Sequence, residues 1–372
     1  MRRQWLHRIR STSAGAISSA VWGERHGDDS DALWSDIENL IQEGDHGWQR
    51  LVPVEQHRFW NLGLGNEFVW GYDPNADDGR LAATFRQALS SGLNLIDTAD
   101  SYGTGRLNGR SESLLGGFIE ALPASRRSQL VVATKLAPFP WRQGRKGLNR
   151  AFDASRKRLR GHLKRVQLHW STSRYAPWQE AALLDGLADL VQAQQVDELG
   201  VSNVGPRRLR WMETRLRERG VKLRSVQIQW SLLSPGVAPA QELLDVCQSL
   251  DIEVLAYSPL AFGVLGCKPG ETPRPSTWVR QRLFRRLLPE SIPIRQLLAA
   301  IAQERGVSMV QVALNWCRAT GTTPIPGLRS PRQAMDVAAA LTWVLSEAEC
   351  FELTQARASC IARMPSNPFQ SR

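Results

Sequence analysis

The chain has 372 residues, 42% of them hydrophobic, which is enough for one large core such as that of an α/β barrel. The net charge is +11, but only six of the 47 basic residues are lysine. No aromatic side chains alternate with the basic residues, so no nucleic-acid partner is expected. The five cysteines are widely spaced, which predicts reduced thiols and no metal site. No apolar run approaches the roughly 18 residues that span a bilayer, which predicts a soluble protein.

The first 57 residues differ in composition from the rest. Residues 1–23 carry four arginines without any aspartate or glutamate, and an acidic stretch follows. This composition is typical of an organelle transit peptide, and it also fits a disordered N-terminal extension. We expect a cytoplasmic protein in the second case, and a plastid or other organelle protein in the first.

From Phe59 onward, short apolar runs alternate with helical patterns. Eight runs are predicted strands: 60–65, 93–97, 130–134, 166–169, 198–202, 225–230, 253–257 and 322–325. The predicted helices between them are 79–92, 111–121, 148–163, 178–193, 206–219, 238–250, 293–305 and 309–320. Eight strands that alternate with helices indicate a (β/α)8 TIM barrel of the α/β class rather than an open sheet.

The domain boundaries follow from this rhythm. We expect the barrel to occupy residues 58–355, with helices at its C-terminal end, and residues 356–372 to form a tail. Residues 258–292, between strands seven and eight, are rich in Pro, Gly and Arg. They predict a long loop over the barrel mouth.

Four polar residues lie at or just after the ends of predicted strands: Asp97, Tyr102, Lys135 and His169. Parallel strands place their carboxyl ends on one face, so these four side chains are expected to converge. A phenol, an ammonium, a carboxylate and an imidazole together can protonate a carbonyl oxygen while hydride arrives from elsewhere.

The motifs around these positions resemble the aldo-keto reductase superfamily, of the bacterial and plastid type, over roughly residues 58–355. The matching segments, in chain order, are IDTADSYG, GRSESLLG, ATK, LHW, LGVSN, VQIQW, LAYSPL and TPIPGLRS. The resemblance implies an NADPH-dependent reduction of an aldehyde or ketone to an alcohol. It also implies a small-molecule carbonyl substrate and no membrane partner.

The resemblance gives each of the four residues a role. Tyr102 is expected to be the general acid that protonates the carbonyl oxygen. A free phenol has a pKa of about 10, and the ammonium of Lys135 is expected to lower it. Asp97 is expected to hold Lys135 through a salt bridge, and His169 to orient the carbonyl oxygen.

The resemblance also implies an NADP(H) site in the barrel mouth, and no GxGxxG motif follows a strand to suggest a Rossmann site. The residues expected to hold the nicotinamide are Ser202, Asn203, Gln227 and Tyr257. Those expected along the pyrophosphate and adenosine are Ser258, Leu260, Gly263, Gly327, Arg329, Ser330, Gln333 and Asp336. Arg329 precedes a predicted helix that starts near Pro331, and a guanidinium there favours NADPH over NADH because it can bind the 2′-phosphate.

Trp141 and Trp170 are expected to line the substrate site, which favours aromatic or flat substrates. Two alternatives remain open at this stage. The first is a cofactor-binding regulatory or redox-sensing subunit with slow turnover. The second is an enzyme that works mainly in the direction of oxidation, such as a sugar or polyol dehydrogenase.

Overall fold

The computed structural model describes residues 59–62, 73–103, 109–235 and 238–371. The chain divides into two units, Met1–Pro53 and Val54–Arg372. The first unit holds most of the predicted N-terminal extension and lies outside the described residues. Everything that follows concerns the second unit.

The strands of the described residues form one parallel sheet in the order β8-β7-β6-β5-β4-β3-β2-β1-β9. Their bounds are β1 Phe59–Leu62, β2 Leu95–Asp97, β3 Val131–Leu136, β4 Arg165–Leu168, β5 Glu198–Ser202, β6 Leu223–Gln229, β7 Glu253–Tyr257, β8 Thr323–Ile325 and β9 Gly327–Leu328. Because β9 follows β8 directly in the chain and pairs with β1, the sheet curves round on itself. The predicted (β/α)8 barrel is confirmed, and β9 is a short pairing that the sequence did not predict.

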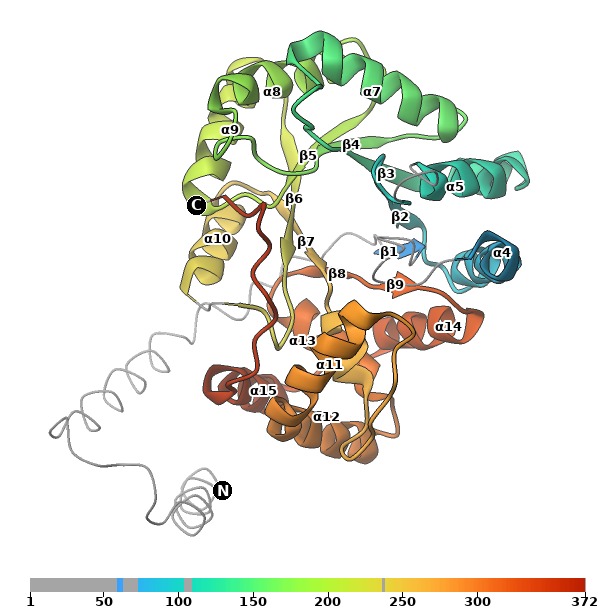
Figure 1. The fold of residues 1–372 in the computed structure, drawn as a ribbon, viewed down its shortest axis with the longest axis vertical. Helices are drawn as coiled ribbons and strands as arrows, with labels where there is room; N and C mark the ends of the chain where they lie inside the picture. The colour runs from blue at the N-terminus through green and yellow to red at the C-terminus, as the bar shows by residue number, and fades with distance from the viewer. Residues whose placement is uncertain (1–58, 63–72, 104–108, 236–237, 372) are drawn as a thin grey trace, which may run out of the picture. The chain divides into compact units, whose positions relative to one another are not determined.

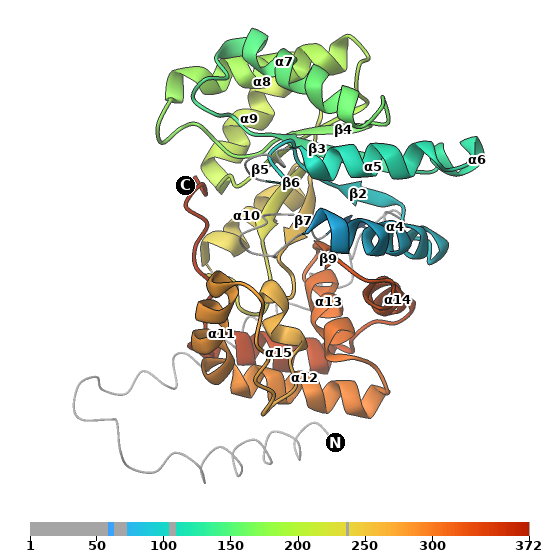
Figure 2. The same ribbon diagram turned by 45° about the vertical axis from the view of Figure 1, so that its right-hand side comes forward.

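Helices surround the strands, as Figures 1 and 2 show. They are α4 Pro74–Ser90, α5 Arg110–Glu120, α6 Ala124–Arg127, α7 Gly144–Arg158, α8 Pro177–Gln192, α9 Pro206–Glu218, α10 Ala238–Ser249, α11 Trp278–Glu290, α12 Ile292–Arg305, α13 Met309–Ala319, α14 Pro331–Ala339 and α15 Glu347–Ser359. Several begin at a side-chain cap, which satisfies a backbone N–H that has no helical partner. Asp73 caps α4, Ser308 caps α13, and Ser346 with Glu349 forms a capping box on α15.

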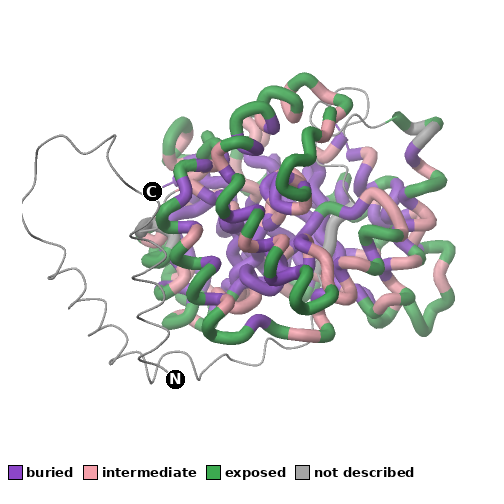
Figure 3. The backbone as a smooth tube through the Cα atoms, turned by 90° about the horizontal axis from the view of Figure 1, so that it is seen from below, coloured by how far each residue is buried: buried purple, intermediate pink, exposed green. Residues whose placement is uncertain are grey.

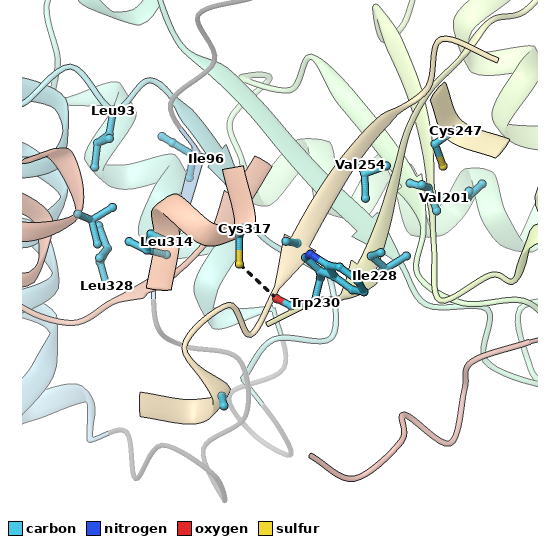
Figure 4. Packing of buried hydrophobic residues seen from close by; sticks show 14 of the residues in the cluster. Leu93, Ile96, Val201, Ile228, Trp230, Cys247, Val254, Leu314, Cys317 and Leu328 are labelled. Atoms are coloured by element: carbon cyan, nitrogen blue, oxygen red, sulfur yellow. Dashed lines mark hydrogen bonds between the residues drawn. The ribbon is translucent and has the colours of Figure 1, made fainter. Parts of the chain in front are cut away.

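Side chains on a strand alternate between its two faces, and this alternation divides the core. Val201, Ile228 and Val254 point outward and belong to the main cluster, which also contains helix residues such as Leu314 (Figure 4). Leu95, Leu255 and Ile325 form a separate small cluster inside the barrel. Buried residues are therefore concentrated around the strands, while the outer helix faces are exposed (Figure 3).

The barrel interior is polar on both sides of this small cluster. Gln227 on β6 donates to Asp97 on β2 across the barrel at 2.6 Å. At the opposite ends of the strands, buried Arg165 on β4 donates to Glu198 at 2.6 Å and to Glu253 at 3.1 Å. Because side chains alternate regularly along each strand, Asp97, Lys135 and Gln167 point to the inside of the barrel.

The predicted long loop 258–292 is only partly a loop. It contains a 3-10 helix, η3 Ala261–Gly266, and the helix α11. The buried residues of α11 are Phe284, Leu287 and Leu288, which have helical spacing. The many arginines and Pro289 between and after them obscured that pattern in the sequence.

At the C-terminal end, α15 continues to Ser359, past the expected boundary at residue 355. Residues 360–371 then run from α15 back across the strand ends toward β5, as the red segment in Figures 1 and 2. All five cysteines are buried free thiols. Among the described residues, no helix combines the length and apolarity needed to cross a membrane.

Candidate active site

The four predicted catalytic residues meet at the carboxyl ends of β2, β3 and β4. Asp97 is the last residue of β2, Lys135 lies in β3, and His169 directly follows β4. Tyr102 stands in the loop after β2. Asp97 and Lys135 are almost fully buried, whereas Tyr102 and His169 are partly exposed at the barrel mouth.

Lys135 connects the carboxylate to the phenol. Its Nζ donates to Asp97 Oδ2 at 2.5 Å and to the backbone oxygen of Thr98 at 2.7 Å. The same Nζ lies 4.8 Å from the centroid of the Tyr102 ring. The salt bridge expected between Lys135 and Asp97 is therefore present, and it fixes the ammonium beside the tyrosine.

The pKa of Tyr102 does not follow the expected direction. Burial raises it above the ordinary value, the Asp97 carboxylate adds to that rise, and the Lys135 ammonium opposes both. Burial also acts to lower the pKa of Lys135, but Asp97 and Tyr102 outweigh it, so the pKa of Lys135 is raised. In the free protein Tyr102 is thus a neutral phenol beside a charged ammonium.

His169 is held as a neutral imidazole. Burial lowers its pKa well below the ordinary value, and the charges of Lys135 and Arg142 act in the same direction. Its Nδ1 lies 3.3 Å from the hydroxyl of Ser101, a contact that the sequence did not suggest. The ring of His169 also meets the ring of Tyr102 edge to face, with centroids 5.9 Å apart.

Gln167 is a second residue that sequence reasoning missed. Its Nε2 donates to Asp97 Oδ1 at 3.0 Å, and its Oε1 accepts from Gln227 at 2.9 Å. Gln227, expected at the nicotinamide, therefore also supports Asp97 from inside the barrel. The available signal was the position of Gln167 two residues before His169 on a buried strand, which places both on the same face.

The end of β5 presents Ser202 and Asn203 side by side. Their expected contact with a carboxamide stays a prediction. Asn203 has a left-handed backbone, with φ of 60°, a conformation that asparagine tolerates better than most residues. Its Nδ2 donates to the backbone oxygen of His169 and to the Ser202 hydroxyl, both at 3.0 Å. Its Oδ1 accepts from the Tyr257 hydroxyl at 2.7 Å, so the ends of β4, β5 and β7 are joined here.

Beyond Tyr257, the chain turns through an unusual backbone. Ser258 has a φ of 52°, and residues 261–263 in η3 have φ values of 48°, 57° and 100°. Within this turn, the backbone N–H groups of Ala261 and Gly263 donate to the backbone oxygens of Ser258 and Leu260, each at 2.9 Å. The pyrophosphate contact expected here stays a prediction. Gly263 meets the requirement of its backbone without a Cβ. Leu260 precedes η3 in the same turn.

Positive charge gathers near the start of α14. Arg329 lies 3.5 Å from Asp77, and burial lowers the pKa of Arg329, with Arg80 adding to the effect. Burial and then the charge of Arg329 lower the pKa of Arg280 on α11. Arg80 and Arg329 both pair with Asp77, and Arg280 lies near Arg329. This cluster of guanidiniums suits a dianionic phosphate, and only Arg329 was predicted.

The other residues of this end have contacts within the fold. Gly327 lies in β9. Ser330 caps α14 by accepting from the backbone of Gln333 at 3.3 Å, and Gln333 Oε1 accepts from the backbone of Arg329 at 2.8 Å. Asp336 accepts from Ser308 at 2.8 Å and from Gln311 at 2.7 Å, which ties α14 to α13. The adenosine contact of Asp336 stays a prediction.

Aromatic rings form one wall beside His169. Phe139 stacks on exposed Trp141 with centroids 4.6 Å apart, and it meets Trp170 edge to face at 5.7 Å. Trp170 is buried and lies 5.0 Å from the His169 ring. Behind this wall, Arg142 pairs with the buried carboxylate of Asp100, whose pKa burial raises to about 6 despite that partner.

The barrel mouth therefore holds a protonated phenol, an ammonium paired with a carboxylate, and a neutral imidazole. The same mouth also presents side chains that suit an amide and a phosphate. Such a fold and site define an oxidoreductase that acts on carbonyl or alcohol groups with a nicotinamide cofactor. The chain belongs to the aldo/keto reductase family, whose family model matches residues 61–358. No group of three metal-binding side chains occurs among the residues that the structure describes.

Two relatives in sequence are named as reductases. A chloroplastic pyridoxal reductase from Arabidopsis thaliana is 43% identical over 332 residues, which cover 87% of this chain and 90% of that protein. An L-glyceraldehyde 3-phosphate reductase from Escherichia coli strain K12 is 30% identical over 249 residues, covering 63% of this chain and 70% of that protein.

Solved structures support the same fold. An aldo-keto reductase from Klebsiella pneumoniae in complex with NADPH has a TM-score of 0.59 at 25% identity, covering 84% of this chain and 92% of that one. A glycerol dehydrogenase from Gluconobacter oxydans has a TM-score of 0.65 at 24% identity, covering 83% and 93%.

Proposed function

We propose that this protein reduces a flat aromatic aldehyde, with pyridoxal as the first candidate, to its alcohol at the expense of NADPH. The observation that carries the proposal is the position of the Tyr102 phenol beside an ammonium that is itself paired with a carboxylate. The phenol of Tyr102 lies beside Lys135 Nζ, which Asp97 holds at 2.5 Å. The proposal depends on what these groups do to a carbonyl oxygen.

Tyr102 gives its proton to the carbonyl oxygen as the carbonyl becomes an alcohol. Its raised pKa keeps the proton on the phenol at neutral pH, so the acid is present in the form that can donate. The phenolate left behind then lies beside the ammonium of Lys135, which stabilises the new negative charge. Asp97 keeps that ammonium in place through the reaction.

His169 orients the carbonyl. A neutral imidazole has one N–H donor and one acceptor nitrogen. In the tautomer with the proton on Nε2, the Ser101 hydroxyl donates to Nδ1 across 3.3 Å, and the Nε2–H is left to donate to the carbonyl oxygen. Two donors on one oxygen polarise the carbonyl and fix its direction.

Bound NADPH would supply the hydride. Ser202 and Asn203 would hold its carboxamide, Tyr257 would cover one face of the ring, and the left-handed turn around Gly263 would hold the pyrophosphate. The charge of Arg329, with Arg80 and Arg280 nearby, supports NADPH over NADH because a 2′-phosphate brings two negative charges to this region.

Two observations support an aromatic aldehyde. Trp170, Phe139 and Trp141 form a continuous set of ring contacts beside His169, and flat rings stack on such surfaces. The relative from Arabidopsis thaliana is named a pyridoxal reductase, and pyridoxal is a flat aromatic aldehyde. Nothing supports the alternative of a regulatory subunit with slow turnover.

The same relative is named chloroplastic. That name supports the organelle alternative for residues 1–57 over the cytoplasmic one, together with the arginine-rich and acid-free composition of residues 1–23.

The test is a panel of carbonyl compounds assayed with NADPH and with NADH, comparing pyridoxal and 4-nitrobenzaldehyde with glyceraldehyde. We expect the aromatic aldehydes to have the higher kcat/KM and NADPH to be preferred. A preference for glyceraldehyde would contradict the proposed substrate class, and no turnover of any carbonyl would contradict the reaction.

Replacing the acid tests the mechanism. Tyr102→Phe keeps the ring and removes the proton, so kcat should fall by about a thousandfold or more while NADPH still binds. NADPH binding followed by fluorescence is the control for folding. Turnover near that of the wild type in Tyr102→Phe would exclude Tyr102 as the proton donor.

A further inference from the structure

Residues 360–371, here called the C-terminal strap, run from α15 along one side of the barrel mouth, past the ends of β7 and β5 (Figures 1 and 2). The backbone N–H of Met364 donates to Leu233 at 2.7 Å, and the side chain of Arg174 donates to the backbone oxygen of Pro368 at 3.1 Å. Near its end, the N–H of Ser371 donates to the backbone oxygen of Asn203 at 3.0 Å. The strap therefore reaches the residues proposed to hold the nicotinamide.

One side chain of the strap enters that site. Asn367 Nδ2 donates to Asn203 Oδ1 and to the Tyr257 hydroxyl, each at 2.8 Å. The oxygen of the same amide accepts from the backbone N–H of Phe369 at 2.9 Å. Because that N–H can only donate, this contact settles which end of the Asn367 amide faces Asn203.

The hydrogen-bonding capacity of Asn203 is filled in this arrangement. Its Oδ1 accepts from Tyr257 and from Asn367, and its Nδ2 donates to His169 and to Ser202. A side-chain amide offers two acceptor positions and two donor hydrogens. A second primary amide, such as the carboxamide of a nicotinamide, must therefore replace a present partner of Asn203.

Asn367 is the partner that can leave most readily. Tyr257 and Ser202 are the last residues of β7 and β5, and the backbone of His169 directly follows β4. Asn367 belongs to a segment without helix or strand structure, in which residues 365, 366, 368 and 369 are exposed. Segments with few buried contacts open at low cost while the surrounding core stays folded.

The strap also covers the neighbouring ring wall. Phe369 stacks on Trp170 with centroids 4.5 Å apart and planes 22° apart. The Ser371 hydroxyl accepts from the backbone N–H of Gly205, just before α9, at 3.3 Å. The contacts of Phe369 and Ser371 hold the strap on the C-terminal side of Asn367, and buried Met364 holds it on the N-terminal side.

From these contacts we propose that the C-terminal strap is an autoinhibitory segment whose Asn367 amide occupies the carboxamide subsite in the free protein, so that the dinucleotide binds only after the strap has moved. This inference rests on the proposed function, because it assigns that subsite to a nicotinamide. It adds that the chain carries its own primary amide as a competitor.

The competition has a measurable consequence. When only a fraction of molecules is open, the apparent dissociation constant for NADPH exceeds the intrinsic one by the inverse of that fraction. A binding rate that depends on prior opening also levels off as the NADPH concentration rises. Weakening the hold of Asn367 should increase the open fraction and the limiting rate together.

The experiment is stopped-flow measurement of NADPH binding to the full-length wild type, Asn367→Ala and Ser366→Ala, with the fluorescence of NADPH as the signal. Ser366 is exposed on the same strap and is the matched control. We expect Asn367→Ala to lower the dissociation constant for NADPH about tenfold, as loss of two hydrogen bonds from the closed form allows, and to raise the limiting rate. Ser366→Ala should match the wild type.

A second variant that lacks residues 367–372 should show at least the gain of Asn367→Ala. Equal affinity and rate in the wild type and Asn367→Ala, or weaker binding in Asn367→Ala, would overturn the role of the strap while leaving the proposed function intact. No NADPH binding by any of the four proteins would overturn the proposed function and the strap with it.

Discussion

Burial and two opposite charges act on the phenol of Tyr102. Burial and the Asp97 carboxylate raise its pKa. The Lys135 ammonium acts in the opposite direction but is outweighed, so the pKa is raised overall. In the proposed mechanism the ammonium matters most after the proton has left, because it then faces a phenolate in a poorly solvated site. The pair of Lys135 and Asp97 would thus stabilise the product of proton transfer more than the resting tyrosine.

The pH dependence follows from these directions. The proposed acid must be protonated to act, and the pKa of Tyr102 lies above its ordinary value of 10.0. Activity should therefore be lost only above about pH 10. The imidazole must be neutral, and the pKa of His169 lies well below 6.5. We expect kcat/KM for aldehyde reduction to stay level between about pH 7 and 9, above the pKa of about 6 of Asp100. A fall centred between pH 7 and 9 would contradict these assignments.

Arg329 tests the cofactor preference at a single side chain. Arg329→Ala removes one guanidinium from the region that it shares with Arg80 and Arg280, so KM for NADPH should rise by about tenfold or more while KM for NADH changes little. Steady-state kinetics with both cofactors measure the split. Arg332→Ala is the control, since Arg332 is exposed in the first turn of α14, three residues further along the chain. Equal increases for both cofactors would exclude a contact with the 2′-phosphate.

At the scale of the strands, the two ends of the barrel differ in proposed function. The carboxyl ends hold Asp97, Lys135 and His169, where the proposed chemistry takes place. The amino ends hold Arg165, which is 1% exposed and joins β4 to Glu198 on β5 and Glu253 on β7. Polar groups at this end of such barrels contribute to stability rather than to catalysis.

Arg165→Leu should therefore reduce stability and spare the kinetics. Its loss leaves two carboxylates facing each other without their cation, which should cost about 3 kcal/mol. Arg224→Gln is the matched control, because Arg224 is partly exposed and 3.8 Å from Glu198, and it should cost less than about 1 kcal/mol. Thermal unfolding measures both. A similar loss in the two variants, or a lower kcat in folded Arg165→Leu, would contradict this division.

For the whole molecule, every residue of the proposed site lies between Asp77 and Ser371. The barrel thus carries both the proposed proton donor and the residues proposed for the cofactor. The composition of residues 1–57 points to a task outside the reaction.

A variant lacking residues 1–57 should keep kcat and KM within about twofold of the full chain, because no site residue is removed. The full chain should enter isolated chloroplasts and the shortened one should remain outside. Kinetics of the purified proteins and an import assay measure the two effects. Loss of turnover on removal of residues 1–57 would show that this segment contributes to the enzyme.

Local patterns explain why so much of the fold could be predicted. Alternating apolar residues mark the strands whether or not their partners are known, so all eight predicted strands overlap observed ones. The helix α11 was missed because arginines fill the positions between its three buried residues. Gln167 was missed because its partners, Asp97 and Gln227, lie on other strands. Its role can be inferred only when the positions of those strands are known.

The sequence by itself determined the barrel, the positions of Asp97, Tyr102, Lys135 and His169 at strand ends, and the family, because strand period and motif order are properties of neighbouring residues. Only the tertiary structure decided the direction of the Tyr102 pKa, since burial depends on the whole site. It alone joined Asn367 to Asn203 and Tyr257, which lie 164 and 110 residues away along the chain. Contacts over such separations depend on how the complete barrel closes, and no local pattern encodes them.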